Sequence, residues 1–282
     1  MKTILLSLGI ALIIGSCSKN VEEVVETKSE IIKNVSYGSH QRNVADIYLP
    51  ENRNSDDTKL MILIHGGGWT DGDKSDLSLY ITEMQKLLPA YAFINLNYRL
   101  ATSTTNQFPA QEEDIKKAVR YFYDKRADYK YSSKIVLVGV SAGAHLALLQ
   151  GYKHSDIVEP AAIISFFAPT DMAKMYNDPI TPSLPQLLKA LTGFTYAQNP
   201  DIYNNSSPVN FVGSTSAPTL VFHGGKDEVV PVQQARLLEA QLKNNGVQHE
   251  LVIYPEEGHG WFGTTLQDSF NRITSFLAQH VE

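Results

Sequence analysis

The chain has 282 residues, of which 43% are hydrophobic and 19% are charged, a composition typical of a globular protein and unlike that of a disordered one. The length suits a single α/β domain. The formal net charge of −6, with no basic stripe, argues against a nucleic-acid partner, and the lack of an apolar run of 18 residues argues against a transmembrane helix.

The first residues have the pattern of an export signal. Lys2 is followed by an uncharged apolar run at 4–14, then by small residues and Cys17, the single cysteine of the chain. An ordinary secretory signal with an incidental cysteine is one interpretation. We favour a second, because a cysteine directly after such a run resembles a bacterial lipobox, in which that cysteine becomes the acylated first residue.

On this interpretation, residues 1–16 are a lipoprotein signal peptide and residues 17–30, polar and rich in glutamate, are a flexible tether. Acyl chains on Cys17 would anchor the protein to a membrane, with no other membrane contact expected. Ser18 follows the cysteine, which resembles lipoproteins sent to the outer membrane. We therefore expect an exported protein at that membrane, on its periplasmic or its outer face. A lone cysteine excludes an internal disulfide.

From residue 31 onward, strand-like and helix-like stretches alternate, and no internal repeat is evident. The stretches at 31–37 and 43–49 are expected to pair as antiparallel strands. Short apolar runs predict further strands, and helical spacing of apolar residues predicts helices between them: strands at 60–64, 92–96, 134–138, 163–167, 219–222 and 250–254, and helices at 77–88, 111–126, 142–149, 231–244 and 266–280.

This alternation predicts one domain over residues 31–282, with a mainly parallel central sheet covered by helices on both faces. Residues 172–210 break the rhythm with several prolines and aromatic residues, and we expect 172–205 to form a small cap. Ligands of such sheets bind beyond the carboxyl ends of the strands, which is where a site should be sought.

The sequence Gly139-Val140-Ser141-Ala142-Gly143 follows the predicted strand at 134–138 directly. A G-x-S-x-G motif is weak evidence alone, and a glycine-rich turn without chemistry is the alternative. Its position between a buried strand and a helix is the one that a nucleophilic serine requires. Glycines allow a sharp turn that lifts the hydroxyl of Ser141 toward a substrate, so Ser141 is the predicted nucleophile.

Three glycines follow the strand at 60–64, in the sequence His65-Gly66-Gly67-Gly68-Trp69. Successive glycines let backbone N–H groups approach the oxygen that becomes negative when a serine attacks a carbonyl carbon. We expect Gly67, Gly68 and Ala142 to supply these oxyanion-hole donors. A phosphate-binding loop fits the sequence less well than an oxyanion loop does, because no Lys-Ser/Thr follows the glycines in the required register. His65 is expected to brace the loop.

The acid and the base are expected in the order serine, acid, histidine. Asp227 lies on a glycine-rich loop after the strand at 219–222, with Glu228 as the alternative acid. His259 lies between glycines after the strand at 250–254. His223 precedes the acid, and His145 is expected in the core or behind the site. In the predicted mechanism, His259 takes the proton of Ser141, Asp227 orients the imidazole, and an acyl-enzyme forms and is hydrolysed.

With these residues in place, the chain resembles the hormone-sensitive-lipase-like branch of the α/β-hydrolases, and within it the bifunctional feruloyl and acetyl-xylan esterase-like proteins. The resemblance covers about residues 31–282. It implies the α/β-hydrolase fold and a carboxylesterase acting on small acyl esters, such as acetyl or feruloyl groups on carbohydrate. Ala144 departs from relatives that carry a second glycine there. The motifs that carry it are His65 to Trp69, Asn97-Tyr98-Arg99-Leu100, Phe108-Pro109-Ala110 with Asp114, Gly139 to Ala147, Pro169-Thr170-Asp171, Ser207-Pro208-Val209, and the Asp227 and His259 loops.

The expected partner is a small-molecule or oligosaccharide ester, with no cofactor and no metal, since no metal-ligand cluster is visible. Trp69 and Trp261 adjoin the predicted site loops and are expected to contact substrate. Four cap aromatics either line a pocket or form the core of the cap: Tyr176, Phe194, Tyr196 and Tyr203. An amidase or exopeptidase with the same triad, and an inactive hydrolase fold used for binding, are the alternative functions.

Overall fold

The structure, a computed structural model, describes residues 27–281. The predicted signal peptide, Cys17 and most of the predicted tether lie outside the described residues. None of the helices within 27–281 combines the length and the apolar character that a bilayer crossing requires.

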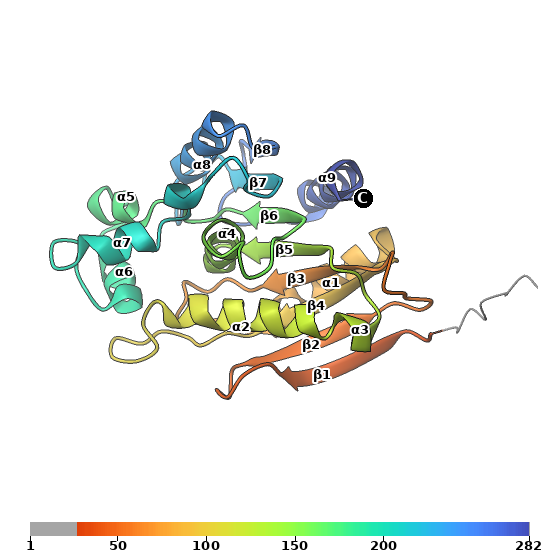
Figure 1. The fold of residues 1–282 in the computed structure, drawn as a ribbon. Helices are drawn as coiled ribbons and strands as arrows, with labels where there is room; N and C mark the ends of the chain where they lie inside the picture. Colours follow the sequence, from red (N-terminus) through yellow and green to blue (C-terminus); the bar gives the residue numbers. More distant parts are fainter. Residues whose placement is uncertain (1–26, 282) are drawn as a thin grey trace, which may run out of the picture.

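The centre of the molecule is an eight-stranded sheet in the order β1-β2-β4-β3-β5-β6-β7-β8 (Figure 1). The first two pairings, β1 with β2 and β2 with β4, are antiparallel, and all the later pairings are parallel. The predicted mainly parallel sheet is therefore confirmed. Its strands are β1 (Glu30–Ser36), β2 (Val44–Leu49), β3 (Lys59–Ile64), β4 (Tyr91–Leu96), β5 (Ile135–Val140), β6 (Ala162–Phe166), β7 (Thr219–Gly224) and β8 (His249–Tyr254).

Helices cover both faces of the sheet, and each face has its own apolar core. On one face α2 (Ala110–Asp124), α4 (Ala142–Lys153) and α8 (Gln233–Asn244) pack on the strands. On the other face lie α1 (Ser78–Leu87) and α9 (Gly263–His280). Side chains of β3 alternate between the two cores: Leu60, Ile62 and Ile64 face the first, and Met61 and Leu63 the second.

Two predicted helices differ from those in the structure. The stretch predicted at 111–126 ends as α2 at Asp124, and a separate turn of helix, α3 (Arg126–Tyr129), follows it. The helix predicted to end at Leu149 continues to Lys153. Its last turns stay buried, and Gly151 lets the helix approach Ile163. A Cβ added at Gly151 would lie 2.3 Å from the Ile163 side chain.

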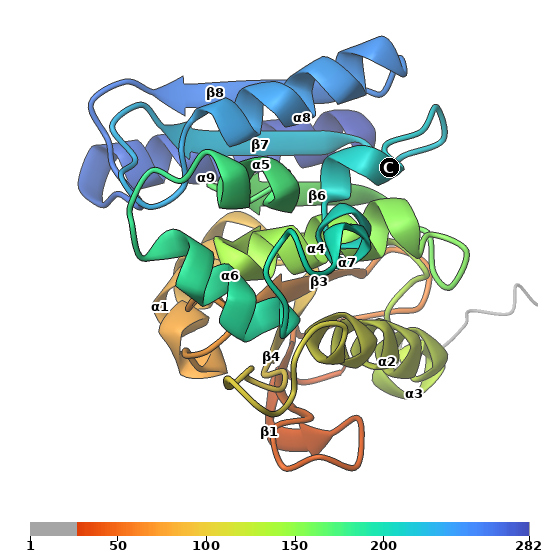
Figure 2. The same cartoon turned by 90° about the vertical axis from the view of Figure 1, so that its left-hand side faces the viewer.

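Three short helices lie between β6 and β7, in the segment predicted as a cap. They are α5 (Met172–Asn177), α6 (Leu184–Thr192) and α7 (Pro200–Asn205). Figure 1 shows them together beyond the arrowheads of β5 and β6, and Figure 2 shows them from that side, in front of the sheet. Two single turns of helix complete the described elements, η1 (Lys74–Leu77) and η2 (Pro208–Phe211).

A buried ion pair ties the segment after β4 to α2. The carboxylate of Asp114 is fully buried and accepts hydrogen bonds from the Arg99 backbone N–H at 2.9 Å and from the Arg99 guanidinium at 2.8 Å through each carboxylate oxygen. The guanidinium also donates to the carbonyl oxygen of Ala110 at 2.9 Å. The Asn97-Tyr98-Arg99 motif and Asp114 therefore fix the loop between β4 and α2.

We predict that Asp114→Asn lowers the free energy of unfolding by about 2–3 kcal/mol, because it leaves the Arg99 guanidinium without a carboxylate. This value is below that of a fully buried pair, since the Arg99 side chain is 22% exposed. Urea unfolding would measure the change. Asp124→Asn, which breaks an exposed pair with Arg120, is the matched control and should cost less than about 0.5 kcal/mol. Equal costs for the two variants would contradict the prediction.

Candidate active site

Ser141 occupies a sharp turn between β5 and α4. Its backbone has φ 54° and ψ −119°, a conformation that a residue with a side chain rarely adopts. The Ser141 N–H donates to the carbonyl oxygen of Phe166 at 2.9 Å. A Cβ at Gly143 would lie 2.1 Å from the carbonyl oxygen of Ile64, and one at Gly139 would lie 2.3 Å from that of Gly143. Both glycines of the motif are therefore required by contact with backbone.

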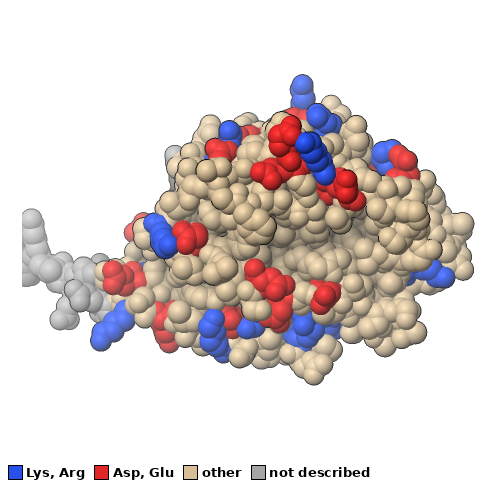
Figure 3. All heavy atoms as spheres, turned by 180° about the vertical axis from the view of Figure 1, so that it is seen from behind, with Lys and Arg blue, Asp and Glu red and all other residues tan. Residues whose placement is uncertain are grey.

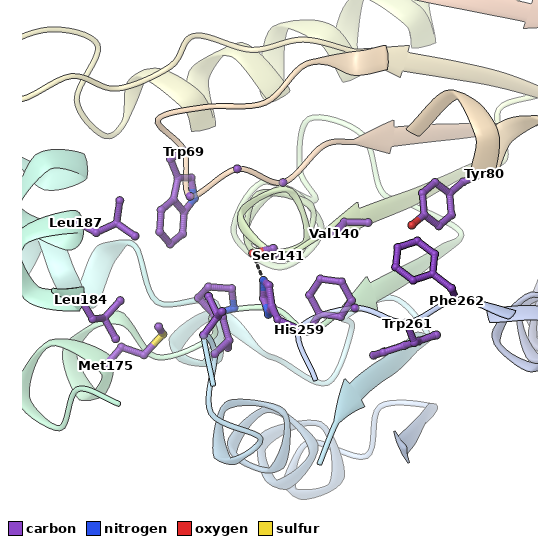
Figure 4. Close-up of a pocket in the computed structure, with 18 residues that line it drawn as sticks. Trp69, Tyr80, Val140, Ser141, Met175, Leu184, Leu187, His259, Trp261 and Phe262 are labelled. Atoms are coloured by element: carbon purple, nitrogen blue, oxygen red, sulfur yellow. Dashed lines mark hydrogen bonds between the residues drawn. The ribbon is translucent and has the colours of Figure 1, made fainter. Parts of the chain in front are cut away.

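The structure brings the three predicted triad residues together. His259 Nε2 lies 2.9 Å from Ser141 Oγ, and His259 Nδ1 lies 2.8 Å from Asp227 Oδ2 (Figure 4). A carboxylate only accepts, so Nδ1 carries the proton and donates it to Asp227. Nε2 is then free to accept the hydroxyl proton of Ser141. This is the arrangement in which an imidazole can activate a serine.

Asp227 is held as an anion. Its Oδ1 accepts the backbone N–H groups of Val229 and Val230, both at 2.8 Å. Burial acts to raise the pKa of Asp227, but hydrogen bonds from His223 and His259 outweigh it and hold that pKa well below its usual range. The neighbouring Glu228, the alternative acid, is exposed. His223, set aside in the sequence analysis because it precedes the acid, donates from Nε2 to the carbonyl oxygen of Val230 and lies 3.4 Å from Asp227.

The glycine loop after β3 presents free backbone donors. Gly67 and Gly68 have positive φ values of 99° and 56°, and the carbonyl oxygen of Gly67 accepts from Thr70 and Asp71. The Ala142 N–H is the first of α4 and has no partner within the helix. Among residues 27–281, no protein acceptor takes the N–H groups of Gly67, Gly68 or Ala142. Gly66 packs against Ser141, since a Cβ added at Gly66 would lie 3.4 Å from the Cβ of Ser141.

His65 and two partners hold this glycine loop from behind. The Tyr98 hydroxyl donates to the carbonyl oxygens of His65 and Gly66 at 3.0 and 3.1 Å. The rings of Tyr98 and His65 stack with their centroids 4.3 Å apart. The Arg42 guanidinium donates to the carbonyl oxygens of Gly72 and Tyr98, both at 2.8 Å. His65 is thus in the bracing position expected. Arg42 was not predicted, because it lies between β1 and β2, far from the motifs in sequence.

Both predicted substrate-contacting tryptophans are buried, and both indole N–H groups have protein acceptors. Trp69 donates to His145 Nδ1 at 3.1 Å, and Trp261 donates to Ser269 Oγ at 2.9 Å. His145 Nε2 lies 2.7 Å from the carbonyl oxygen of Ser206, so it carries the proton and donates it. Burial lowers the pKa of His145 to about 4, which keeps it neutral. The tryptophans can therefore offer ring surface to a substrate but no hydrogen bond.

Ser141 opens into a cavity of about 470 Å³, a size that suits a small-molecule ligand. Figure 4 shows side chains on opposite sides of the Ser141–His259 pair. We call the first group the cap side, formed by Trp69, Met175, Leu184 and Leu187. We call the second the α9 side, formed by Tyr80, Val140, Phe167, Trp261 and Phe262.

Apart from the loop residues and the tryptophans, the sequence did not identify this lining. The aromatic residues considered for the pocket lie elsewhere: Tyr176, Tyr196 and Tyr203 pack on one another with ring centroids 5.0–6.3 Å apart, and Phe194 is exposed. The three tyrosines form the core of the cap, which was the second interpretation. The cap instead contributes Met175 and two leucines to the cavity.

Among the described residues that line this cavity there is no Asp, Glu, Lys or Arg. Figure 3 shows acidic and basic side chains in small mixed groups on the rear face of the molecule, with uncharged surface between them. Within residues 27–281, no three His, Cys, Asp or Glu side chains are grouped so that they could hold a metal ion. The groups available at the site are therefore the hydroxyl, the imidazole, the carboxylate and the backbone N–H donors.

These features together define the α/β-hydrolase class. They are a mainly parallel sheet, a serine on a strand–helix turn, and an acid and a histidine that each follow a later strand. The BD-FAE family model matches residues 45–242, and the chain belongs to this family. That range includes Ser141 and Asp227 and ends before His259. The expected family and fold are thereby confirmed.

Similar proteins carry esterase names. Esterase LipQ of Mycobacterium tuberculosis is 28% identical over 227 residues, which cover 75% of this chain and 52% of LipQ. The chain spans about half the length of the curated relatives LipQ and LipM. A structure titled as a truncated form of a carbohydrate esterase from gut microbiota has a TM-score of 0.76 and 28% identity, with 92% of this chain and 98% of that chain covered. The bifunctional GH43-CE of Bacteroides eggerthii has a TM-score of 0.78 and 25% identity, with 89% and 38% covered.

The buried His145 should make stability depend on pH. Its pKa is about 4 in the folded protein and about 6.5 in an unfolded chain. Between these values the unfolded state binds the extra proton, so the free energy of unfolding should fall as the pH is lowered from about 6.5 to 4, by roughly 3 kcal/mol. In His145→Asn, whose amide oxygen can still accept from Trp69, this part of the slope should be lost. Unfolding in urea at a series of pH values measures it, and equal slopes would contradict the prediction.

Proposed function

We propose that the protein is a carboxylic ester hydrolase that uses Ser141 as nucleophile, His259 as general base and acid, and Asp227 as the group that orients the imidazole. The observation that carries this proposal is the unbroken chain of hydrogen bonds from Ser141 Oγ through His259 to Asp227, at 2.9 and 2.8 Å, at the wall of a cavity. The esterase names of the relatives support it.

In the proposed reaction, Ser141 Oγ attacks the ester carbonyl carbon while His259 Nε2 takes its proton. The carbonyl oxygen becomes an anion that faces the free N–H groups of Gly67, Gly68 and Ala142, and one such donor is worth about 3 kcal/mol in other enzymes. His259 then protonates the leaving alcohol. A water molecule hydrolyses the acyl-enzyme by the same steps, and the anionic Asp227 stabilises the imidazolium in both halves.

We propose small acyl esters of carbohydrates, such as acetyl or feruloyl esters, as substrates. The BD-FAE family and the two neighbours titled as carbohydrate esterase and GH43-CE support this class. An amidase or exopeptidase with the same triad is the second candidate, because a relative named uncharacterized peptidase YtmA of Bacillus subtilis is 29% identical over 110 residues. An inactive hydrolase fold used for binding is the third, and the complete hydrogen-bonded chain at Ser141 argues against it.

We predict that Ser141→Ala lowers kcat for p-nitrophenyl acetate by about a million-fold and abolishes covalent labelling by a fluorophosphonate. Asp227→Asn should lower kcat by about 10⁴-fold, because the imidazole loses its fixed tautomer. Glu228→Gln, which changes the exposed neighbour, is the matched control and should retain wild-type activity.

The same assay separates the candidate functions. Fast cleavage of aminoacyl anilides with negligible ester turnover would favour the peptidase. Folded protein that is neither labelled nor active would favour the binding protein. Release of acetate from acetylated xylan oligosaccharides would support the carbohydrate substrate.

We also propose that the exported protein is held at the bacterial outer membrane by acyl chains on Cys17, on the sequence pattern alone. Cys17→Ser should move the protein from the membrane fraction to the soluble fraction of cells, because two or more acyl chains are needed for stable anchoring. Ser18→Ala is the control and should leave the distribution unchanged. Membrane partition that is the same in Cys17→Ser and wild type would contradict the anchor.

A further inference from the structure

A small recess opens from the α9 side of the cavity. Its volume is about 40 Å³, and it shares Tyr80, Val140, Phe167, Gly260 and Trp261 with the main cavity, while Phe166 and Leu266 complete its wall. At roughly 10–15 Å³ for each water-sized group, this volume accommodates about three carbon atoms. The main cavity is more than ten times larger.

The recess begins next to the reacting groups. Val140 directly precedes Ser141, and Trp261 is two residues after His259. The ring of Phe167 lies 4.5 Å from that of His259. A group attached to a carbon on Ser141 Oγ therefore needs only a few bonds to reach it. In Figure 4 three residues of the recess, Tyr80, Val140 and Trp261, lie on the opposite side of the Ser141–His259 pair from the leucines of the cap.

Packing fixes the size of the recess. Phe166 stacks on Phe222 at 4.8 Å, and Trp261 meets Phe167 at 5.4 Å and Tyr254 at 5.0 Å, while its N–H donates to Ser269. The buried rings of the wall are at most 7% exposed. Because a closely packed core resists displacement, the part of the wall formed by these rings cannot move to admit a longer group without loss of these contacts.

The chemistry of the wall selects between the two parts of an ester. Apart from the Tyr80 hydroxyl, the side chains offer hydrocarbon and ring surface, since the Trp261 N–H is already donated. A sugar has several hydroxyls, which would be buried there without hydrogen-bond partners, and that is unfavourable. A sugar within a glycan also continues in two directions, whereas an acyl chain is attached at one end and can finish in a small recess.

We propose that this recess holds the acyl group and limits it to short aliphatic chains, acetyl to butyryl, so that the alcohol lies on the cap side. Of the two ester classes proposed above, this narrows the substrates to acetyl esters and makes feruloyl esters poor substrates. The proposal rests on the ester hydrolase activity proposed above. Leu266, in the first turn of α9 and at the boundary of the recess, is the residue that should set the limit.

The test is the chain-length profile of kcat/KM for p-nitrophenyl acetate, propionate, butyrate, hexanoate and octanoate, with methyl ferulate as a further arm. In the wild type we expect kcat/KM to fall about tenfold or more from butyrate to hexanoate, the discrimination typical of an apolar pocket. Leu266→Ala should raise the hexanoate-to-acetate ratio about tenfold, and Leu266→Phe should lower the butyrate-to-acetate ratio by a similar factor. A purely structural role for Leu266 would not shift the profile in opposite directions.

Leu184→Ala, on the cap side, is the matched control and should leave the chain-length order as it is in the wild type. A flat profile, rapid turnover of methyl ferulate, or an equal shift in both Leu266 variants would overturn the recess assignment while the esterase activity stands. A longer-chain preference created by Leu184→Ala alone would also overturn it and would place the acyl group on the cap side. Folded protein without turnover of any ester would instead contradict the proposed function.

Discussion

The turn between β5 and α4 is the constraint on which the site depends. Ser141 has a positive φ, which a side chain makes unfavourable, and the surrounding backbone keeps it there. The turn is possible only because Gly139 and Gly143 lie in contact with backbone at distances that no Cβ would permit. The same close approach places Gly66 against Ser141, so the nucleophile and the oxyanion loop are positioned by one set of contacts.

The electrostatic part of the site is arranged before a substrate arrives. Asp227 is buried, accepts two backbone N–H groups and stays ionised, so it can stabilise an imidazolium on His259 without rearrangement. The glycine loop is fixed by Tyr98 and Arg42 on one side, and through Trp69 by His145 on the other. Donors held in this way need no reorganisation when charge develops on the substrate oxygen.

The cavity shows how apolar surface complements these few polar groups. Its two sides come from different parts of the fold, the cap helices α5 and α6 on one side and β5, α1 and the loop that precedes α9 on the other. Under the proposed activity, apolar walls would exclude water and strengthen the interactions of Ser141, His259 and Asp227 with the reacting ester. The difference in size between the recess and the main cavity then separates the two parts of the substrate, under the proposed activity.

The sequence by itself determined the eight strands, the helices that cover the sheet to within a few residues, and the positions of Ser141, Asp227 and His259, because these depend on local requirements. A sharp turn needs glycines at fixed spacing, and parallel strands bring their carboxyl ends to one edge. Only the tertiary structure decided which side chains line the cavity, that the cap tyrosines pack on one another, and that Arg42 and His145 support the loop. These contacts join segments far apart in the chain, and long-range packing leaves no mark in a short motif.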